Sequence, residues 1–260
     1  MLSGEVSLAE LAAEGLDLPP AAAAALAAAA AAEADFQEAL WLERGHGAAG
    51  ADEGAARRLY ESAAACGHAG ALTALGDMYN AGTGGLPQDM SAAAGYYRRG
   101  AAGGSARAQR MLGVYHYNGH GDVPQDAAEA VRLFRVAAAA GHADAYCNLG
   151  RCYYLGEGGL EQDAAEAVRL FRVAAERGDA VAQYNLGICA EHGHGGEAPD
   201  LAAAERWYCL AAAQGQEGAV ADLERLRRVH RPGSGGEPGG SGGSSDESST
   251  SEEEEEEEEE

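Results

Sequence analysis

The chain has 260 residues and a formal net charge of −24, and all 18 of its Lys and Arg residues are arginine. The lack of lysine excludes Schiff-base chemistry, the phosphate-binding P-loop and the Ser-x-x-Lys acylation motif, each of which needs a lysine amine. The acidic composition argues against binding to a nucleic-acid backbone, which requires a basic footprint, and favours basic partners.

The cysteine pattern and the N-terminus indicate the compartment. The five cysteines are odd in number and do not recur at one interval, so reduced, mostly buried thiols are expected. This favours a cytoplasmic or nuclear protein. The N-terminus lacks the basic start of a signal peptide, and residues 21–32 are too short and too weakly hydrophobic to span a membrane. We therefore expect no association with a membrane.

The N-terminal part of the chain predicts helices. Residues 1–18 carry a short amphipathic segment that Ser7 can cap. Pro19–Pro20 then favours the start of a second helix, whose alanine-rich sequence has high helix propensity to about residue 42. We interpret residues 1–32 as an N-terminal helical cap. A partly frayed helix is the alternative, because polyalanine buries little apolar area.

A 37-residue unit recurs along most of the remaining chain. The letters QDAAEAVRLFRVAA occur at 125–138 and again, unchanged, at 162–175. Self-similarity at a fixed period predicts a stacked repeat array. Four columns keep the same step: Gly67, Gly104, Gly141, Gly178 and Gly215; Leu75, Leu112, Leu149, Leu186 and Leu223; Asp52, Asp89, Asp126, Asp163 and Asp200; and Tyr60, Tyr97, Phe134, Phe171 and Tyr208.

These columns define the domain organisation. Each regular unit predicts two antiparallel helices, and neighbouring units must share a core because one pair cannot bury its own apolar face. A degenerate first unit covers 33–66, and regular units cover 67–103, 104–140, 141–177 and 178–215. Residues 216–230 predict a C-terminal capping helix coated with arginine. Residues 231–260 predict a disordered Gly/Ser linker and poly-Glu tail with a net charge of −11.

The unit at 141–177 carries clear local signals. Its first helix is predicted over residues 143–155. Gly150 lies inside that helix despite a propensity cost of about 1 kcal/mol, so we predict that another helix approaches closely there. Asp163 is the predicted N-cap of the second helix, and Glu166 is expected to complete a capping box. Gly178 is the predicted residue after its end.

The repeated pattern A-x-x-x-L-G-x-x-Y-x-x-G-x-G, then Q-D, then E-A-V-x-L-F-x-x-A-A-x-x-G, resembles the Sel-1-like repeat. That repeat is a relative of the tetratricopeptide repeat with a longer, glycine-containing inner loop. The resemblance covers about residues 45–215 and implies an all-α, right-handed α-solenoid of stacked antiparallel helix pairs. It also implies a scaffold for protein complexes, because family members serve as adaptors in signalling and protein quality control. A few bacterial members have been linked to β-lactam binding. The residues that carry the resemblance include Leu149, Gly150, Tyr153, Gly156, Gly158, Asp163, Ala167, Phe171, Ala174, Ala175 and Gly178.

The candidate binding surface is the concave groove lined by the first helices. Arginine and tyrosine are enriched at interaction hot spots, and Asn148 and Asn185 share one column that suits bidentate binding of a peptide backbone. The expected partner is a protein or peptide, and ordinary solvated helix surface is the alternative. The candidate residues are Asp77, Arg107, Arg110, Tyr117, Asn148, Arg151, Tyr154, Tyr184 and Asn185.

Charged residues outside this groove have two interpretations. Glu129 with Arg132, and Glu166 with Arg169, predict helix-surface salt bridges of a few tenths of a kcal/mol each. The Glu252–Glu260 tail is a polyanion that suits basic proteins. An acidic-tail binder or chaperone of basic proteins, of the histone-binding type, is therefore the second functional hypothesis. A related hypothesis is that the tail competes for the groove arginines.

The sequence predicts neither a cofactor nor a metal site. His192, His194 and Cys189 provide three ligands at most, whereas structural zinc needs four in a closed geometry. No nucleophile and base can be paired from the sequence, so we expect no enzymatic activity. A hydrolase of the β-lactam-binding kind is the least favoured alternative.

Overall fold

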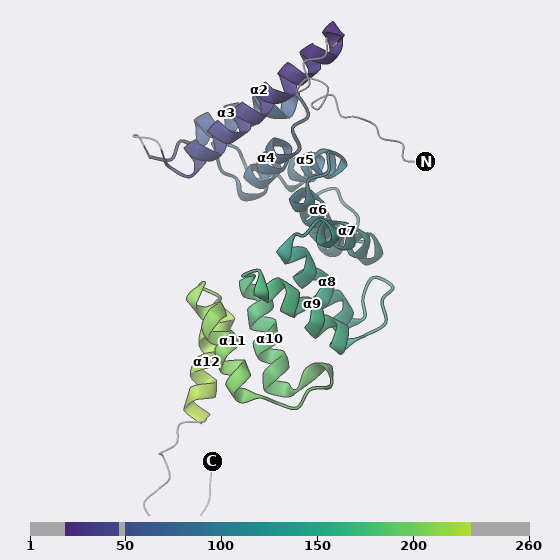
Figure 1. Cartoon of the computed structure of the whole chain (residues 1–260), viewed down its shortest axis with the longest axis vertical. Coiled ribbons are helices and arrows are strands. Elements are labelled where there is room, and N and C mark those ends of the chain that lie inside the picture. Colours follow the sequence, from purple (N-terminus) through teal and green to yellow (C-terminus); the bar gives the residue numbers. More distant parts are fainter. Residues whose placement is uncertain (1–18, 47–49, 230–260) are drawn as a thin grey trace, which may run out of the picture.

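The computed structural model describes residues 19–46 and 50–229, so the predictions for residues 1–18 and for the tail lie outside the described residues. The described chain forms eleven α-helices, one 3-10 helix and no strand, stacked as successive pairs in an elongated array (Figure 1). The predicted all-α solenoid is confirmed. The pairs are α2 (Pro20–Glu43) with α3 (Glu53–Ala65), α4 (Ala69–Ala81) with α5 (Met90–Ala102), α6 (Ala106–Asn118) with α7 (Ala127–Ala139), α8 (Ala143–Leu155) with α9 (Ala164–Glu176), and α10 (Ala180–His192) with α11 (Leu201–Ala213), followed by α12 (Glu217–Val229).

The aspartate column fixes where the second helix of each pair begins. Each of these five aspartates accepts a hydrogen bond from a backbone N–H in the first turn, at 2.8–3.0 Å. The capping box expected at Asp163 is only half formed. The Asp163 N–H donates to Tyr153 O at 2.8 Å, and the Glu166 carboxylate binds Arg169 instead of reaching back. The backbone of the preceding helix has therefore replaced the Glu166 carboxylate.

Glycines in the first helices allow the two helices of a pair to approach closely. A Cβ atom at Gly150 would lie 2.8 Å from the Phe171 ring, and one at Gly113 would lie 2.6 Å from the Phe134 ring. Gly76 and Gly187 meet tyrosine rings in the same way. The approach predicted from Gly150 is confirmed, and in these four units it lets the aromatic column fill the core.

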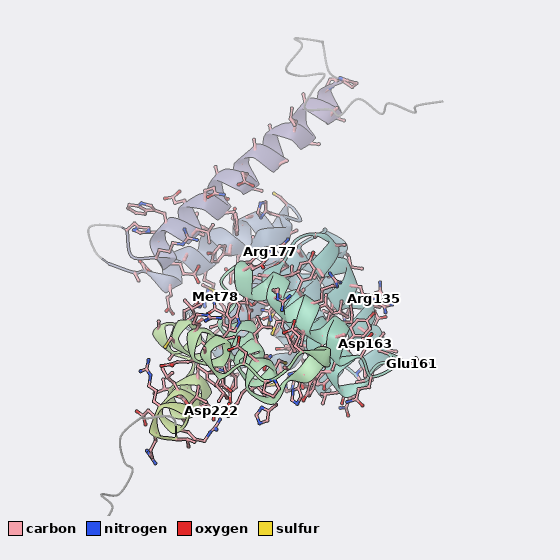
Figure 2. All side chains as sticks on the ribbon, turned by 60° about the horizontal axis from the view of Figure 1, so that its bottom comes forward. Met78, Arg135, Glu161, Asp163, Arg177 and Asp222 are labelled. Carbon is pink, nitrogen blue, oxygen red and sulfur yellow. The ribbon has the colours of Figure 1, made fainter. Side chains whose placement is uncertain are left out.

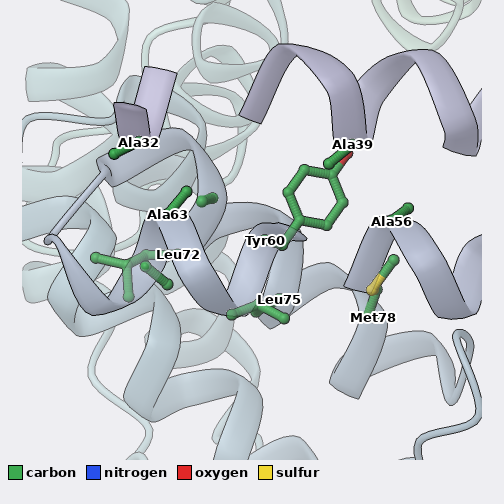
Figure 3. Packing of buried hydrophobic residues seen from close by; sticks show 10 residues of the cluster. Ala32, Ala39, Ala56, Tyr60, Ala63, Leu72, Leu75 and Met78 are labelled. Carbon is green, nitrogen blue, oxygen red and sulfur yellow. The ribbon is translucent and has the colours of Figure 1, made fainter. Parts of the chain in front are cut away.

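The first pair differs from the others because α2 has 24 residues, whereas the other α-helices have 13. Only Ala32 and Ala39 of α2 are buried, and they pack with Tyr60 and Leu75 of the following helices (Figure 3). The part of α2 from Pro20 to Ala31 projects from the array (Figure 1). The boundary expected at residue 32 therefore falls inside one continuous helix.

The loops inside the pairs fasten one unit to the preceding one. Gly84 N–H donates to the carboxylate of Glu53 in the preceding unit, at 2.9 Å. A Cβ atom at Gly121 would lie 2.7 Å from Met90 O, at the start of α5 in the preceding unit. Gly158 packs on the start of α7 in the same way and has a φ of 66°, so it needs glycine for both backbone conformation and space.

Candidate partner-binding surface

The first helices α4, α6, α8 and α10 lie on the inside of the array. Side chains join neighbouring first helices: Tyr115 of α6 donates a hydrogen bond to Asn80 of α4 at 2.6 Å, and α8 contacts α10 directly. We call the side chains that α4, α6, α8, α10 and α12 present here the inner face. All nine predicted binding residues lie on α4, α6, α8 or α10. The structure uses most of them to join one unit to the next, which the sequence interpretation did not anticipate.

Two arginines of α6 bind carboxylates on the neighbouring first helices. Arg107 Nη2 lies 2.9 Å from the Asp77 carboxylate, which also accepts a hydrogen bond from Tyr97 at 2.8 Å. Arg110 has only 17% of its side chain exposed, and its Nη2 lies 3.5 Å from the Asp144 carboxylate. Arg107 and Arg110 therefore stabilise the stack before any partner binds.

Two tyrosines reach into the loop of the following unit. Tyr117 donates a hydrogen bond to the Glu157 carboxylate, and the Arg151 guanidinium lies 4.4 Å above the Tyr117 ring. Burial and this carboxylate raise the pKa of Tyr117 to about 12, so the phenol stays a donor at neutral pH. Tyr154 contacts His194 Nδ1 at 3.2 Å, one repeat further along. Both contacts span 40 residues.

The C-terminal helix is fastened by a charged cluster. Tyr184 donates to Asp222 on α12 (labelled in Figure 2) at 2.9 Å. Arg225 of α12 makes two hydrogen bonds to the Glu191 carboxylate, at 2.7 and 2.8 Å, and Tyr208 donates to the same carboxylate at 2.8 Å. The hydrogen bonds from Arg225 and then Tyr208 lower the pKa of Glu191. The predicted capping helix is thus held by Tyr184, which the sequence analysis named as a binding residue, and by contacts of Glu191 and Asp222 that it did not anticipate.

The two predicted asparagines retain free hydrogen-bonding capacity. Asn148 Nδ2 is buried without a partner. Asn185 lies one repeat further along, on α10. Its Nδ2 has one long contact, 3.8 Å to the Cys147 sulfur, and sulfur is a weak acceptor. Leu155 of α8 and Val181 of α10 are each 50% exposed. Helices α8 and α10 therefore carry two amides without strong partners and two exposed apolar side chains.

The residues considered for metal binding or catalysis make ordinary structural contacts. The His192 and His194 rings stack at 5.5 Å, and His192 Nδ1 donates to Ile188 O at 3.0 Å. Across the described ranges, no group of three or more histidine, cysteine or acidic side chains is arranged to hold a metal ion. All five cysteines are free thiols, and burial raises the pKa of Cys152 and of Cys189 to about 11.

The two predicted surface salt bridges are confirmed. Arg132 binds Glu129, and Arg169 binds Glu166, each with a shortest distance of 2.6 Å. Both arginines are well exposed, so each pair contributes only a few tenths of a kcal/mol.

None of the described helices combines the length and the apolar character that a membrane span requires.

Stacked helix pairs with an inner face of polar and aromatic side chains define a helical repeat protein. The sequence model of the Sel1 repeat matches residues 20–68, 69–105, 106–142, 143–179 and 180–216. The chain therefore belongs to the Sel1 repeat family, whose members generally act as scaffolds for protein interaction. Comparison with curated protein sequences found no match.

Solved structures support the same fold. A Sel1 repeat protein from Oxalobacter formigenes has a TM-score of 0.68 and 29% identity, over 78% of this chain and 78% of that one. A protective antigen of uropathogenic Escherichia coli has a TM-score of 0.59 and 26% identity, over 85% of this chain but 47% of that one. An immunity protein from Pseudomonas aeruginosa, at 21% identity and a TM-score of 0.52 over 77% of this chain and 79% of that one, shows the fold alone.

Proposed function

We propose that the chain is a scaffold that binds an extended segment of a partner protein along the inner face, centred on α8 and α10. The observation that carries the proposal is the pair of amides one repeat apart, Asn148 and Asn185, which lack strong partners. A buried polar group without a partner costs free energy, so the Asn148 amide gains a hydrogen bond when its side chain turns outward to the main chain of a bound peptide. Leu155 and Val181 supply apolar contacts for its side chains.

The other predicted residues have a supporting role in this proposal. Arg107, Arg110, Tyr117, Tyr154 and Tyr184 are held by contacts between units. A surface whose side chains are fixed before binding loses less conformational entropy when a partner docks. These residues therefore shape and stiffen the inner face, and the two asparagines make the directional contacts.

Affinity capture tests this function. Tagged full-length chain is compared with the double variant Asn148→Ala, Asn185→Ala. The matched control is Arg169→Ala, Arg172→Ala, which removes two exposed side chains of α9. We expect the wild type and the control to capture the same partners. The asparagine variant should bind them about thirtyfold more weakly, because it loses two hydrogen bonds that contribute about 1 kcal/mol each. Equal capture by all three proteins would show that the inner face is not the binding surface.

The acidic tail supports a second candidate function, binding of basic proteins. Glu252–Glu260 gives nine consecutive carboxylates, which attract a cationic partner at long range. Replacing all nine with glutamine should then abolish capture of a basic partner, and raising the salt concentration should weaken it steeply, because exposed charges are screened. Binding at the two asparagines depends far less on salt, so the two candidates are separable.

We propose no catalytic activity for the chain. The raised pKa values of Cys152 and Cys189 keep these thiols protonated and therefore poor nucleophiles at neutral pH. Nothing in the described part of the chain supports a β-lactam-binding hydrolase. The free thiols are most compatible with a reducing compartment, so we propose the cytoplasm or the nucleus.

A further inference from the structure

A cavity of about 310 Å³ lies between α5, α6 and α7, on the side of the second helices. Leu112 and Leu133 give it apolar walls, and Arg98 and Arg132 also line it. Gln109 of α6 contributes the remaining polar group. Its Nε2 lies 3.4 Å from Ala101 O, and its Oε1 is buried with no partner.

The next junction of the array, between α7, α8 and α9, has the same lining except at one position. Seven of the eight residues that line the cavity are identical one repeat further along, and only Gln109 differs, where Tyr146 takes its place. The Tyr146 ring packs against the equivalent walls. The corresponding pairs include Arg98 with Arg135, Leu112 with Leu149, and Leu133 with Leu170.

The residue that follows the last helix of a junction differs from one junction to the next, and at the next two junctions it contacts the position equivalent to Gln109. Arg177 (labelled in Figure 2) covers the Tyr146 ring, with its guanidinium 4.9 Å from the ring centre. One junction further, Gln183 replaces the tyrosine, and Gln214 donates a hydrogen bond to its Oε1 at 2.8 Å. At the junction that holds the cavity, the position equivalent to Arg177 and Gln214 is Ala140, at the end of α7. The cavity is therefore open and its buried acceptor unpaired.

We propose that this cavity is a second interaction site, which receives a tyrosine side chain presented by a partner protein. Tyr146, which stands in place of Gln109 one repeat further along, shows that these walls accept a tyrosine ring. Gln109 Oε1 is buried without a partner, so it becomes an acceptor for the phenol O–H once the Gln109 side chain turns toward the cavity. Aromatic side chains inserted into pockets are the usual anchors of protein interfaces. The site lies between α5, α6 and α7 and uses neither Asn148 nor Asn185, so it does not depend on the function proposed above.

The test is an NMR titration of the full-length chain with N-acetyltyrosinamide. The wild type should show saturable shifts at the cavity with one equivalent bound. The variant Gln109→Tyr, Ala140→Arg copies the filled junction and should bind at least tenfold more weakly. N-acetylphenylalaninamide should bind several-fold more weakly than the tyrosine amide, because it leaves Gln109 Oε1 unpaired.

The reverse variant, Tyr146→Gln with Arg177→Ala, opens a second cavity with the same walls and should bind two equivalents. The filled variant adds packing and is expected to fold, so the test stands even where the opened variant is unstable. The proposal is overturned when the wild type shows no saturable binding, when the filled variant binds as well as the wild type, or when the folded reverse variant still binds one equivalent.

Discussion

At the scale of single residues, the glycines inside the first helices have a role that a stability measurement can check. Gly113→Ala places a Cβ atom 2.6 Å from the Phe134 ring, so the two helices must separate or the ring must move. We expect a loss of about 1–3 kcal/mol, as for other overpacked cores. Urea unfolding of the full chain measures it.

Gly95→Ala is the matched control for this substitution. Gly95 lies inside α5, and a Cβ atom there would meet nothing within 4 Å. Alanine should therefore stabilise the array by about 0.5–1 kcal/mol through helix propensity alone. If both substitutions change the free energy of unfolding equally, close packing is not the reason why position 113 is glycine.

Single residues also show where prediction from the sequence stops. The role of Gly150 was predictable from the sequence, because a glycine that recurs inside a helix indicates that another helix packs closely against it. The contacts of Tyr117 and Tyr154 did not, since each joins a partner 40 residues away in the next unit. A period gives the fold of one unit, but the partner of a side chain depends on how successive units are placed.

At the scale of elements, helix starts and ends were predictable because they depend on a few neighbouring residues. The helix predicted at 143–155 is α8, and Asp163 and Gly178 have the predicted cap positions. The docking of each inner loop on the preceding unit was not predictable. The sequence predicts only a turn at Gly158, whereas the structure shows that the missing side chain also leaves room for the backbone of Ala127.

The attachment of α12 should depend on pH. Hydrogen bonds from Arg225 and Tyr208 lower the pKa of Glu191 below the ordinary glutamate value of about 4.3. A lowered carboxyl pKa gives stability that is present above the ordinary value and is lost as the pH falls through the lowered value. We therefore expect the hydrogen-exchange protection of α12 to fall as the pH is lowered from 6 to 3.

Glu191→Gln separates this effect from general acid unfolding. The variant should have less protection in α12 at pH 6, and its further loss on acidification should be smaller than in the wild type. If the wild type and the variant lose α12 protection in parallel, Glu191 is not the titrating group that holds this helix.

At the scale of the whole molecule, stability should be distributed unevenly along the array. Each unit buries its apolar face against its neighbours, so units in the middle gain contacts on both sides. Helices α6 to α9 are flanked in this way, whereas no residue from Pro20 to Ala31 is buried. We expect hydrogen exchange to be slowest in α6 to α9 and fastest in residues 20–31, since an isolated helix of this length is marginal in water.

Ala28→Gly tests whether the projecting part of α2 is energetically separate from the array. The substitution costs a helix about 1 kcal/mol, so it should abolish the remaining protection of residues 20–31. Because Ala28 is exposed, the unfolding midpoint of the array should stay unchanged. A shift as large as that of Gly113→Ala would mean that the projecting segment supports the core. In that case the interface it makes, rather than its helix propensity, would explain its length.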